Sequence, residues 1–322
     1  MSSPAVPAFA IVSIGEILVE FVSHDTGCGL TRIAGYSGPY PSGAPAIFVD
    51  QAARMGARAA MVGGVGDDGF GRAVLGRLER DGVDVSAVAR DPVRPTGVAF
   101  VSYYADGRRD FIFHLGGTAA DGFDVPPDAF DPATAILHVS AASLGNARMR
   151  PAILRAVRAV VAAGGRVTCD PNARPELMRD AEVRGALDEA MAAAWCLLPS
   201  TSDLAYLHPD LSEDAAIDCL LSERAEIVAL KRGAGGVTLV SGTERHDLPG
   251  HRVTELDPTG AGDCFGGTLV ALLAQGVPLA EAGRRANAAG ALAVTRRGPM
   301  EGNSTPAEID AFLAALPAGD AR

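Results

Sequence analysis

Apolar runs with the length of buried strands alternate with segments of helical periodicity along most of the chain. The strand-like runs lie at 8–14, 58–62, 135–139, 166–170, 195–198 and 226–230. The helix-like segments lie at 43–55, 69–81, 148–163, 181–193, 213–222, 262–275, 279–295 and 306–315. Apolar strands that alternate with helices predict an α/β fold, in which a mostly parallel sheet is covered by helices on both faces.

Some extended segments in the first third of the chain do not fit this alternation. They lie at 18–23, 28–34, 97–104 and 108–115. The last two flank Asp106-Gly107, and Asp-Gly between apolar runs is a strong signal for a two-residue hairpin. We expect a small β-sheet lid, formed by about 15–40 and 95–118 and inserted in one domain that spans 1–322. Alternatively, the hairpin only extends an edge of the main sheet.

Composition excludes several classes of protein. The 322-residue chain is 48% hydrophobic, so it can bury a large core, and its net charge of −11 argues against non-specific nucleic-acid binding. Its five scattered cysteines form no CxxC pair, and we expect buried, reduced thiols in a cytoplasmic protein. The apolar N-terminal run follows no basic residue and is too short to span a bilayer, so neither a signal peptide nor membrane association is predicted.

The strongest chemical signal is the segment Asp-Pro-Thr-Gly-Ala-Gly-Asp at 257–263, which leads into a helical pattern. Glycines at 260 and 262 allow a ligand to approach the backbone closely. The N–H groups of Gly260, Ala261 and Gly262, together with the helix dipole, would form an anion site. Asp263 would lie in the first turn, where its carboxylate could accept a hydroxyl proton during phosphoryl transfer.

This segment matches the C-terminal signature of the ribokinase-like (PfkB) carbohydrate kinases, and the resemblance covers nearly the whole chain. Weaker counterparts follow the order of the family: Ser-Gly-Ala-Pro-Ala at 42–46, the Gly/Asp loop at 63–71, Asp-Pro-Asn-Ala-Arg at 170–174 and Lys-Arg-Gly-Ala-Gly-Gly at 231–236. The resemblance implies a three-layer sandwich with a β-sheet lid, often dimeric through that lid. It also implies ATP-dependent phosphorylation of a sugar, with Asp263 as the base and Gly260 to Gly262 as the anion hole.

The resemblance assigns further residues to ATP and its ions. The nucleotide side is implied to include Asn172, Ser200, Asp203, Lys231, Gly233, Gly235, Gly236, Asn287 and Ala291. Magnesium would be carried by the ATP phosphates and water, without direct protein ligands. Some relatives bind a monovalent cation near the positions matching Asp257 and Gly298, which makes potassium a candidate here.

The sugar side departs from the family pattern. The candidate sugar residues are Glu16, Glu20, Ser42, Gly43, Tyr104, His114 and Arg174. Ile47 stands where the family has a sugar-binding Asn. Relatives that phosphorylate 2-keto-3-deoxygluconate carry an Arg near the end of the lid hairpin, whereas here His114 lies close to that place. We therefore favour an uncharged ketose such as fructose or tagatose, with the sugar acid as the alternative substrate.

Two functions from other classes compete with the kinase. Gly64-Val-Gly66-Asp-Asp-Gly69 fits the dinucleotide-binding pattern GxGxxG, and Asp84 follows at the distance of a ribose-binding acid. This pattern would suggest an NAD-dependent oxidoreductase. However, the two Asp side chains inside the turn would repel a pyrophosphate. A non-catalytic sugar or nucleotide sensor would have the same fold. A Walker A kinase is excluded, because the only lysine is Lys231 and an Arg follows it.

Overall fold

The computed structural model describes residues 10–106, 108–173, 177–222 and 225–316. Its larger sheet contains ten strands. They are β1 (Ala10–Ile14), β4 (Arg58–Gly66), β5 (Val83–Asp84), β6 (Val88–Asp91), β9 (Ala135–Ser140), β10 (Arg166–Asp170), β11 (Cys196–Leu197), β12 (Ile227–Lys231), β13 (Val237–Ser241) and β14 (Arg245–Leu248). The order is β14-β13-β12-β11-β10-β9-β1-β4-β5, and β6 pairs with β4. All pairs are parallel except the edge pairs that β13 makes.

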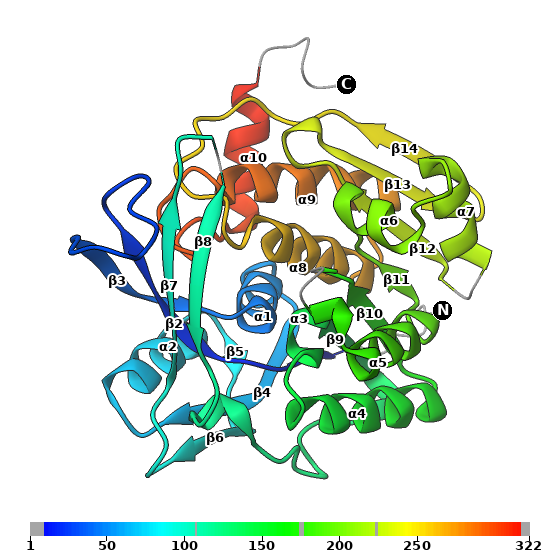
Figure 1. Cartoon of the computed structure of the whole chain (residues 1–322). Helices are drawn as coiled ribbons and strands as arrows, with labels where there is room; N and C mark the ends of the chain where they lie inside the picture. The colour runs from blue at the N-terminus through cyan, green and yellow to red at the C-terminus, as the bar shows by residue number, and fades with distance from the viewer. Residues whose placement is uncertain (1–9, 107, 174–176, 223–224, 317–322) are drawn as a thin grey trace.

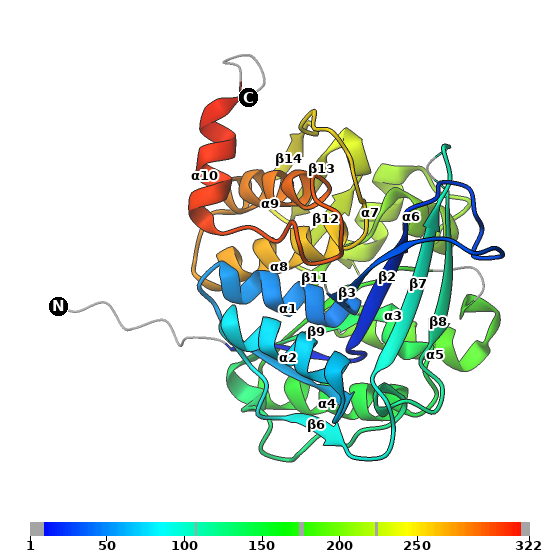
Figure 2. The same cartoon turned by 90° about the vertical axis from the view of Figure 1, so that its left-hand side faces the viewer.

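Helices cover both faces of this sheet (Figures 1 and 2). They are α1 (Ala44–Arg54), α2 (Gly69–Arg80), α3 (Ala141–Leu144), α4 (Met149–Ala163), α5 (Ala181–Ala192), α6 (Thr201–Leu207), α7 (Glu213–Ser222), α8 (Ala261–Ala274), α9 (Leu279–Ala293) and α10 (Pro306–Ala315). One apolar core lies under α4, α5 and α7, and another lies under α1, α8, α9 and α10. The predicted α/β fold is thus confirmed. In the described part of the chain, no helix combines the length and hydropathy needed to cross a bilayer.

A separate sheet of four strands lies beside the main sheet (Figure 2). The strands are β2 (Leu18–Ser23), β3 (Tyr36–Ser42), β7 (Gly97–Tyr103) and β8 (Arg109–His114), in the order β3-β2-β7-β8. β7 and β8 pair antiparallel, as the hairpin prediction requires, although Gly107 lies outside the described residues. The Phe21 ring joins this small sheet to α2 through Phe70, whose ring centroid is 5.6 Å away.

The sequence prediction was wrong about one strand of the small sheet. Segment 28–34 is irregular, and the strand comes later, as β3. Gly27, Gly29 and Leu30 have φ angles of 75°, 59° and 57°. These left-handed conformations turn the chain and are incompatible with a continuous strand.

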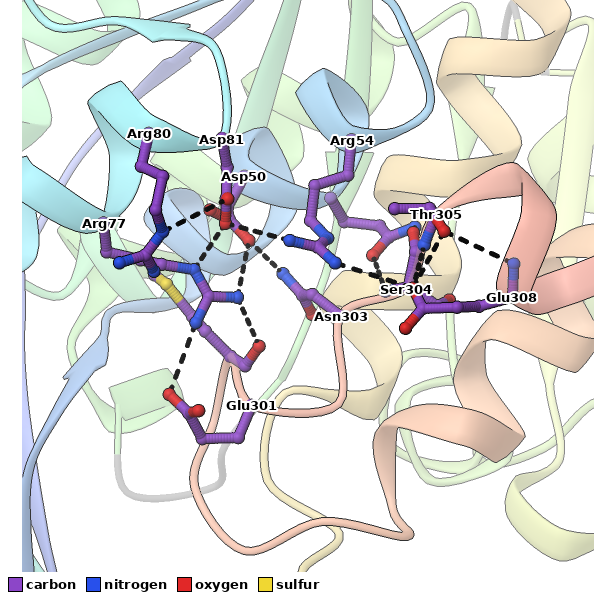
Figure 3. Close-up of polar contacts among 12 residues, drawn as sticks. Asp50, Arg54, Arg77, Arg80, Asp81, Glu301, Asn303, Ser304, Thr305 and Glu308 are labelled. Atoms are coloured by element: carbon purple, nitrogen blue, oxygen red, sulfur yellow. Dashed lines mark hydrogen bonds and ion pairs between the residues drawn. The ribbon is translucent and has the colours of Figure 1, made fainter.

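A network of buried charged side chains joins α1, α2 and the segment between α9 and α10 (Figure 3). Arg77 Nε donates to Asp81 at 2.5 Å, and Arg77 Nη2 donates to the Met300 carbonyl at 2.8 Å and lies 3.5 Å from Asp50. Asn303 Nδ2 donates to the Asp50 carboxylate at 2.7 Å. We call this set the interhelical network.

Candidate active site

A cavity of about 1020 Å³ lies between the small sheet and the carboxyl ends of the parallel strands. This is the edge where open α/β sheets bind ligands. Its lining comes from β2, β8, the residues that follow the central strands and the start of α8. It includes Glu16, Glu20, Ser42, Gly43, Ile47, Arg109, Phe111, Phe113, Asp170, Asn172, Ser200, Asp203, Lys231, Gly233, Thr259, Gly260, Gly262 and Asp263.

The glycine-rich turn before α8 shapes one wall of the cavity. Gly260 has a φ of 81°, and a Cβ at this position would lie 2.4 Å from the Pro299 carbonyl oxygen. Only glycine fits there without strain. α8 begins at Ala261 and Asp263 lies in its first turn. Because the first N–H groups of a helix have no partners within the helix, this turn is suited to hold an anion beside Asp263.

Lys231 extends from the end of β12 into the same part of the cavity. Its ammonium group forms an ion pair with Asp170, the last residue of β10. A Cβ on Gly262 would lie 3.4 Å from Lys231 Nζ, so the ammonium group contacts the glycine turn. Burial opposes the charge of Lys231, but Asp170, and after it Asp263 and Asp203, raise the pKa of this lysine. Lys231 therefore provides a fixed positive charge at this wall.

Asp203 and Ser200 lie at the start of α6, where Ser200 pairs with Lys231 in an isolated parallel bridge. Ser200 caps this helix, and its N–H and Oγ each donate to Asp203 Oδ2 at 2.6 Å. Asp203 Oδ1 accepts the N–H of Ala173 at 2.7 Å. Asn172 has a positive φ of 34° and donates its N–H to Asp170 Oδ1 at 3.2 Å. The Asp203 carboxylate is thus held by protein donors on both oxygens.

Glu20 projects from β2 into the cavity and is only 2% exposed. Burial, together with the charge of Asp257, raises its pKa to about 8, although Arg109 and a hydrogen bond from Ser42 act in the opposite direction. Among the described residues, its Oε1 has no hydrogen-bond partner. A buried carboxyl oxygen without a partner is suited to bind a ligand hydroxyl.

Asp257 is fully buried and connects the small sheet to the loop before α8. It accepts hydrogen bonds from the Tyr103 hydroxyl, from the Thr259 N–H at 3.0 Å and from the Gly298 N–H at 2.9 Å. The structure thus brings together Asp257 and Gly298, the two residues that the family resemblance named for a monovalent cation. Sequence reasoning missed Tyr103, the last residue of β7, whose hydroxyl also lies 2.8 Å from Thr259 Oγ1.

The start of α1 forms the floor of the cavity. Gly43 has a φ of 110°, and a Cβ there would lie 2.4 Å from the Glu16 carbonyl oxygen, so the close approach requires glycine. Glu16 Oε2 accepts the Ser143 hydroxyl at 2.5 Å. The side chain of Ile47 has no polar atom for a sugar, and two of its methyl groups lie 3.3 Å from the position that a Cβ on Gly260 would occupy. This isoleucine supports the glycine turn.

The hairpin strand β8 presents alternate residues to the cavity, and this alternation corrects the expectation for His114. Arg109, Phe111 and Phe113 line the cavity. His114 lies on the other face, where its ring centroid is 6.4 Å from that of Phe100. Because strand side chains alternate with a period of two, the spacing could have shown that Arg109 and His114 lie on opposite faces of β8. Sequence reasoning missed Arg109. It looked for an arginine near the end of the hairpin and found only His114 there, whereas Arg109 brings a guanidinium group to the cavity from the start of β8.

Other predicted residues lie outside the lining of this cavity. Tyr104 is directed away from it and donates its hydroxyl to Asp110 at 2.5 Å. Asn287 donates its side-chain amide to the Pro249 carbonyl at 2.8 Å. Arg174 lies outside the described residues. Within the described chain, the residues of the predicted nucleotide side that the structure does not bring to the cavity are Gly235, Gly236, Asn287 and Ala291.

The dinucleotide-binding interpretation of the first glycine-rich segment is wrong. Gly64 and Gly66 belong to strand β4, which leaves no phosphate-binding turn at these glycines. Asp68 caps α2 by accepting the N–H of Gly71 at 2.8 Å, and it also accepts the N–H of Thr96 at 2.8 Å. A carboxylate therefore occupies the helix N-terminus where a pyrophosphate would have to bind.

Comparison with known proteins agrees with the geometry of the cavity. Residues 9–306 match the model of the pfkB family of carbohydrate kinases. A fructokinase from Vibrio alginolyticus is 31% identical over 280 residues, which cover 85% of this chain and 91% of the relative.

Solved structures share the whole fold. A provisionally named Ribokinase II from E. coli, in complex with ATP and Mg2+, has a TM-score of 0.89 and 39% identity, with 96% of this chain and 100% of that chain covered. The fructokinase from Vibrio cholerae O395, with fructose, ADP and calcium bound, has a TM-score of 0.82 and 27% identity, with 95% and 99% covered.

Proposed function

Because the chain belongs to the pfkB family of carbohydrate kinases, we propose that it uses ATP to phosphorylate a hydroxyl group of a ketose such as fructose. The observation that carries the proposal is the position of Asp263, in the first turn of α8, beside a glycine turn and in the same cavity as Glu16 and Glu20. The fructokinase relatives and the neighbour with bound fructose and ADP support the choice of a ketose.

In the proposed reaction, the sugar hydroxyl oxygen attacks the γ-phosphorus of ATP and the bond from that phosphorus to the leaving ADP oxygen breaks. Asp263 accepts the hydroxyl proton as the new oxygen–phosphorus bond forms. The N–H groups of the turn at 260–262 stabilise the negative charge of the phosphoryl group in transfer. On the sugar side, Glu20 and Ser42 bind hydroxyl groups, and Gly43 lets the sugar approach the backbone.

The nucleotide phosphates bind between the turn and the residues that follow β10, β11 and β12. Asn172, Ser200 and Gly233 line this part of the cavity. The carboxylate of Asp203 already accepts protein hydrogen bonds and that of Asp170 pairs with Lys231. Because both carboxylates already have protein partners, the residues present fit a magnesium ion that is held mainly by ATP phosphates and water. Such an ion would neutralise phosphate charge.

A monovalent cation beside Asp257 and Gly298 is a further part of the proposal. An ionised carboxylate has about four acceptor positions. Tyr103, Thr259 and Gly298 use three of those on Asp257, which leaves room for one more contact. Replacing potassium chloride by tetramethylammonium chloride tests this cation, because turnover should fall if the ion is required.

One observation favours a second substrate class. Arg109 lines the cavity near Glu20, and a guanidinium group can hold a carboxylate through two hydrogen bonds. A sugar acid such as 2-keto-3-deoxygluconate would use this group. The second candidate is therefore a sugar-acid kinase with Arg109 as the anchor.

An ADP-release assay with ATP and magnesium tests these candidates directly. The panel contains fructose, tagatose, aldoses, nucleosides and 2-keto-3-deoxygluconate. Strong turnover of a neutral ketose is the expected result. Turnover of the sugar acid alone, abolished in Arg109→Gln, would replace the ketose by the second candidate. ATP binding without turnover of any sugar would contradict the kinase and favour a non-catalytic sensor.

Dimerisation through the small sheet and a cytoplasmic location complete the proposal. β8 is an edge strand, and its Ile112, which is not part of the cavity lining, is 43% exposed, so a second copy could cover it. A mass from light scattering that is twice the 33.0 kDa of one chain would support the dimer.

The described cysteines are free, and most are buried, which suits the reducing compartment of the proposed cytoplasmic location.

A further inference from the structure

The only lysine of the chain lies in the cavity, next to the glycine turn. Its side chain is 16% exposed, and Nζ lies 3.4 Å from where a Cβ on Gly262 would be placed. Lys231 is also close enough to Asp263 for the two charges to interact. The ammonium group therefore lies at the point where the turn and the proposed base meet.

The hydrogen bonds of this ammonium group are incomplete. A lysine ammonium has three N–H donors. Within the described chain, its hydrogen-bond partner is Asp170, which lines the same cavity. The neighbouring Arg232 differs, because its guanidinium donates to Glu213 at 2.6 and 2.7 Å and to Thr238 at 2.8 Å. Lys231 is thus a half-buried cation with donors available to a ligand.

We infer that Lys231 is a catalytic residue that contacts the phosphoryl group in transfer, and that Asp170 is a positioning residue that holds its ammonium group beside Gly262. This inference rests on the proposed kinase function. No bond to the lysine forms or breaks; its charge and N–H donors stabilise the phosphoryl oxygens while the turn amides bind the same group. Lys231 would then have the role that the P-loop lysine has in Walker A kinases, although it lies at the end of strand β12.

A purely structural role is the competing explanation, because the ion pair also ties the end of β12 to the end of β10. Arg77 provides a matched control: it is another buried cation paired with carboxylates, and it does not line the cavity. Removing either cation should reduce stability. Only the removal of Lys231 should reduce the chemical step.

The test compares Lys231→Ala and Lys231→Met with Arg77→Met, after the wild-type protein has been shown to phosphorylate a sugar. Removing one donor to a charged transition state typically lowers turnover about 10²-fold to 10³-fold. We expect a loss of this size in kcat for both Lys231 variants, with the KM for the sugar changed less than about threefold. Added methylammonium or propylammonium should restore part of the kcat of Lys231→Ala in a saturable way, and should not affect Arg77→Met.

Asp170→Asn tests the positioning role through the pH profile. Asp170 raises the pKa of Lys231, so its removal should shift the alkaline loss of kcat to lower pH. In Lys231→Met this alkaline limb should be absent.

Three results would overturn the inference. Lys231→Met with near-normal kcat would show that the ammonium group does not contact the reacting phosphoryl group. A low kcat that no amine restores, together with an unfolding midpoint as reduced as that of Arg77→Met, would indicate a structural role. In both cases the wild-type kinase activity stands. A wild-type protein that binds ATP and phosphorylates nothing would overturn the kinase proposal and this inference together.

Discussion

Two clusters of charge in this molecule each place a cation beside buried carboxylates, but they differ in how completely the N–H donors of the cation are bonded. In the interhelical network, Arg77 donates to Asp81, Glu301 and the Met300 carbonyl and also lies near Asp50 (Figure 3). In the cavity, Lys231 donates to one carboxylate among the described residues, that of Asp170, and faces the glycine turn.

The difference shows how to distinguish a structural ion pair from a functional one. A buried ion pair on its own is weak support for either role. A cation whose donors are occupied by protein acceptors has little left for a ligand, whereas a cation with open donors in a cavity can bind one. Changes in the cavity should therefore alter turnover or KM, and changes in the interhelical network should alter the free energy of unfolding.

The largest effect is expected at the proposed base. Asp263→Asn removes the proton acceptor while keeping the size of the side chain, so kcat should fall by ~10²-fold to ~10⁴-fold. ATP binding, measured by calorimetry, and the unfolding midpoint should stay close to wild type. Near-normal turnover in Asp263→Asn would contradict the mechanism.

The next effect is on stability. Arg77→Met leaves the carboxylates of Asp50 and Asp81 buried without their cation, and breaking such a pair typically costs about 3 kcal/mol or more. Urea unfolding should show this loss, while kcat stays within about twofold of wild type. Arg158→Met is the control, because its pair with Glu189 is exposed and should contribute less than about 1 kcal/mol. Equal losses in the two variants would contradict the assignment of the network.

A smaller effect is expected from Glu20, whose pKa is about 8. Above that pH its ionised carboxylate makes stronger hydrogen bonds to sugar hydroxyls, so the wild-type KM for sugar should decrease as pH rises from 6 to 9. Glu20→Gln cannot ionise, and its KM should be roughly tenfold higher than wild type at pH 9, with a smaller difference at pH 6. Parallel pH profiles for the two proteins would contradict this role.

The smallest effect concerns the pH dependence of stability. Burial, partly opposed by Arg77 and Asn303, raises the pKa of Asp50 to about 7 from an ordinary value near 4. The folded protein then binds more protons than the unfolded chain between these values, so this group makes stability fall as pH rises from about 4 to 7. Asp50→Asn removes that contribution, and its stability relative to wild type should increase by on the order of 1–2 kcal/mol between pH 5 and pH 6.5. A difference in the free energy of unfolding between the two proteins that stays constant over this pH range would contradict the raised pKa of Asp50.

The elements of the fold follow closely from local sequence patterns. Helices end where glycine can take a positive φ, as at Gly56 (82°) and Gly82 (92°), and the apolar runs are the central strands. The glycine turn before Asp263 could be identified from the sequence, because glycines at 260 and 262 directly precede a helical pattern. β3 was misplaced because the left-handed turn before it includes Leu30, an unusual residue for that conformation, although Gly27 and Gly29 were available as local signals.

The composition of the site depended more on tertiary structure. Alternation along β8 decided that Arg109 enters the cavity and His114 does not, and the register was visible only once the hairpin was paired. Tyr103 bonds Asp257 from 154 positions away, a contact that no local pattern encodes.

The sequence by itself determined the α/β class, the glycine turn and the base candidate, because each depends on residue types within a few positions of one another. Only the tertiary structure decided which side chains face the cavity and which cation stands beside the turn. Lys231 and Gly262 come from β12 and α8, and their contact exists because the packed sheet brings the end of one element against the start of the other. Long-range packing also sets the burial that raises the pKa values of Glu20 and Asp50.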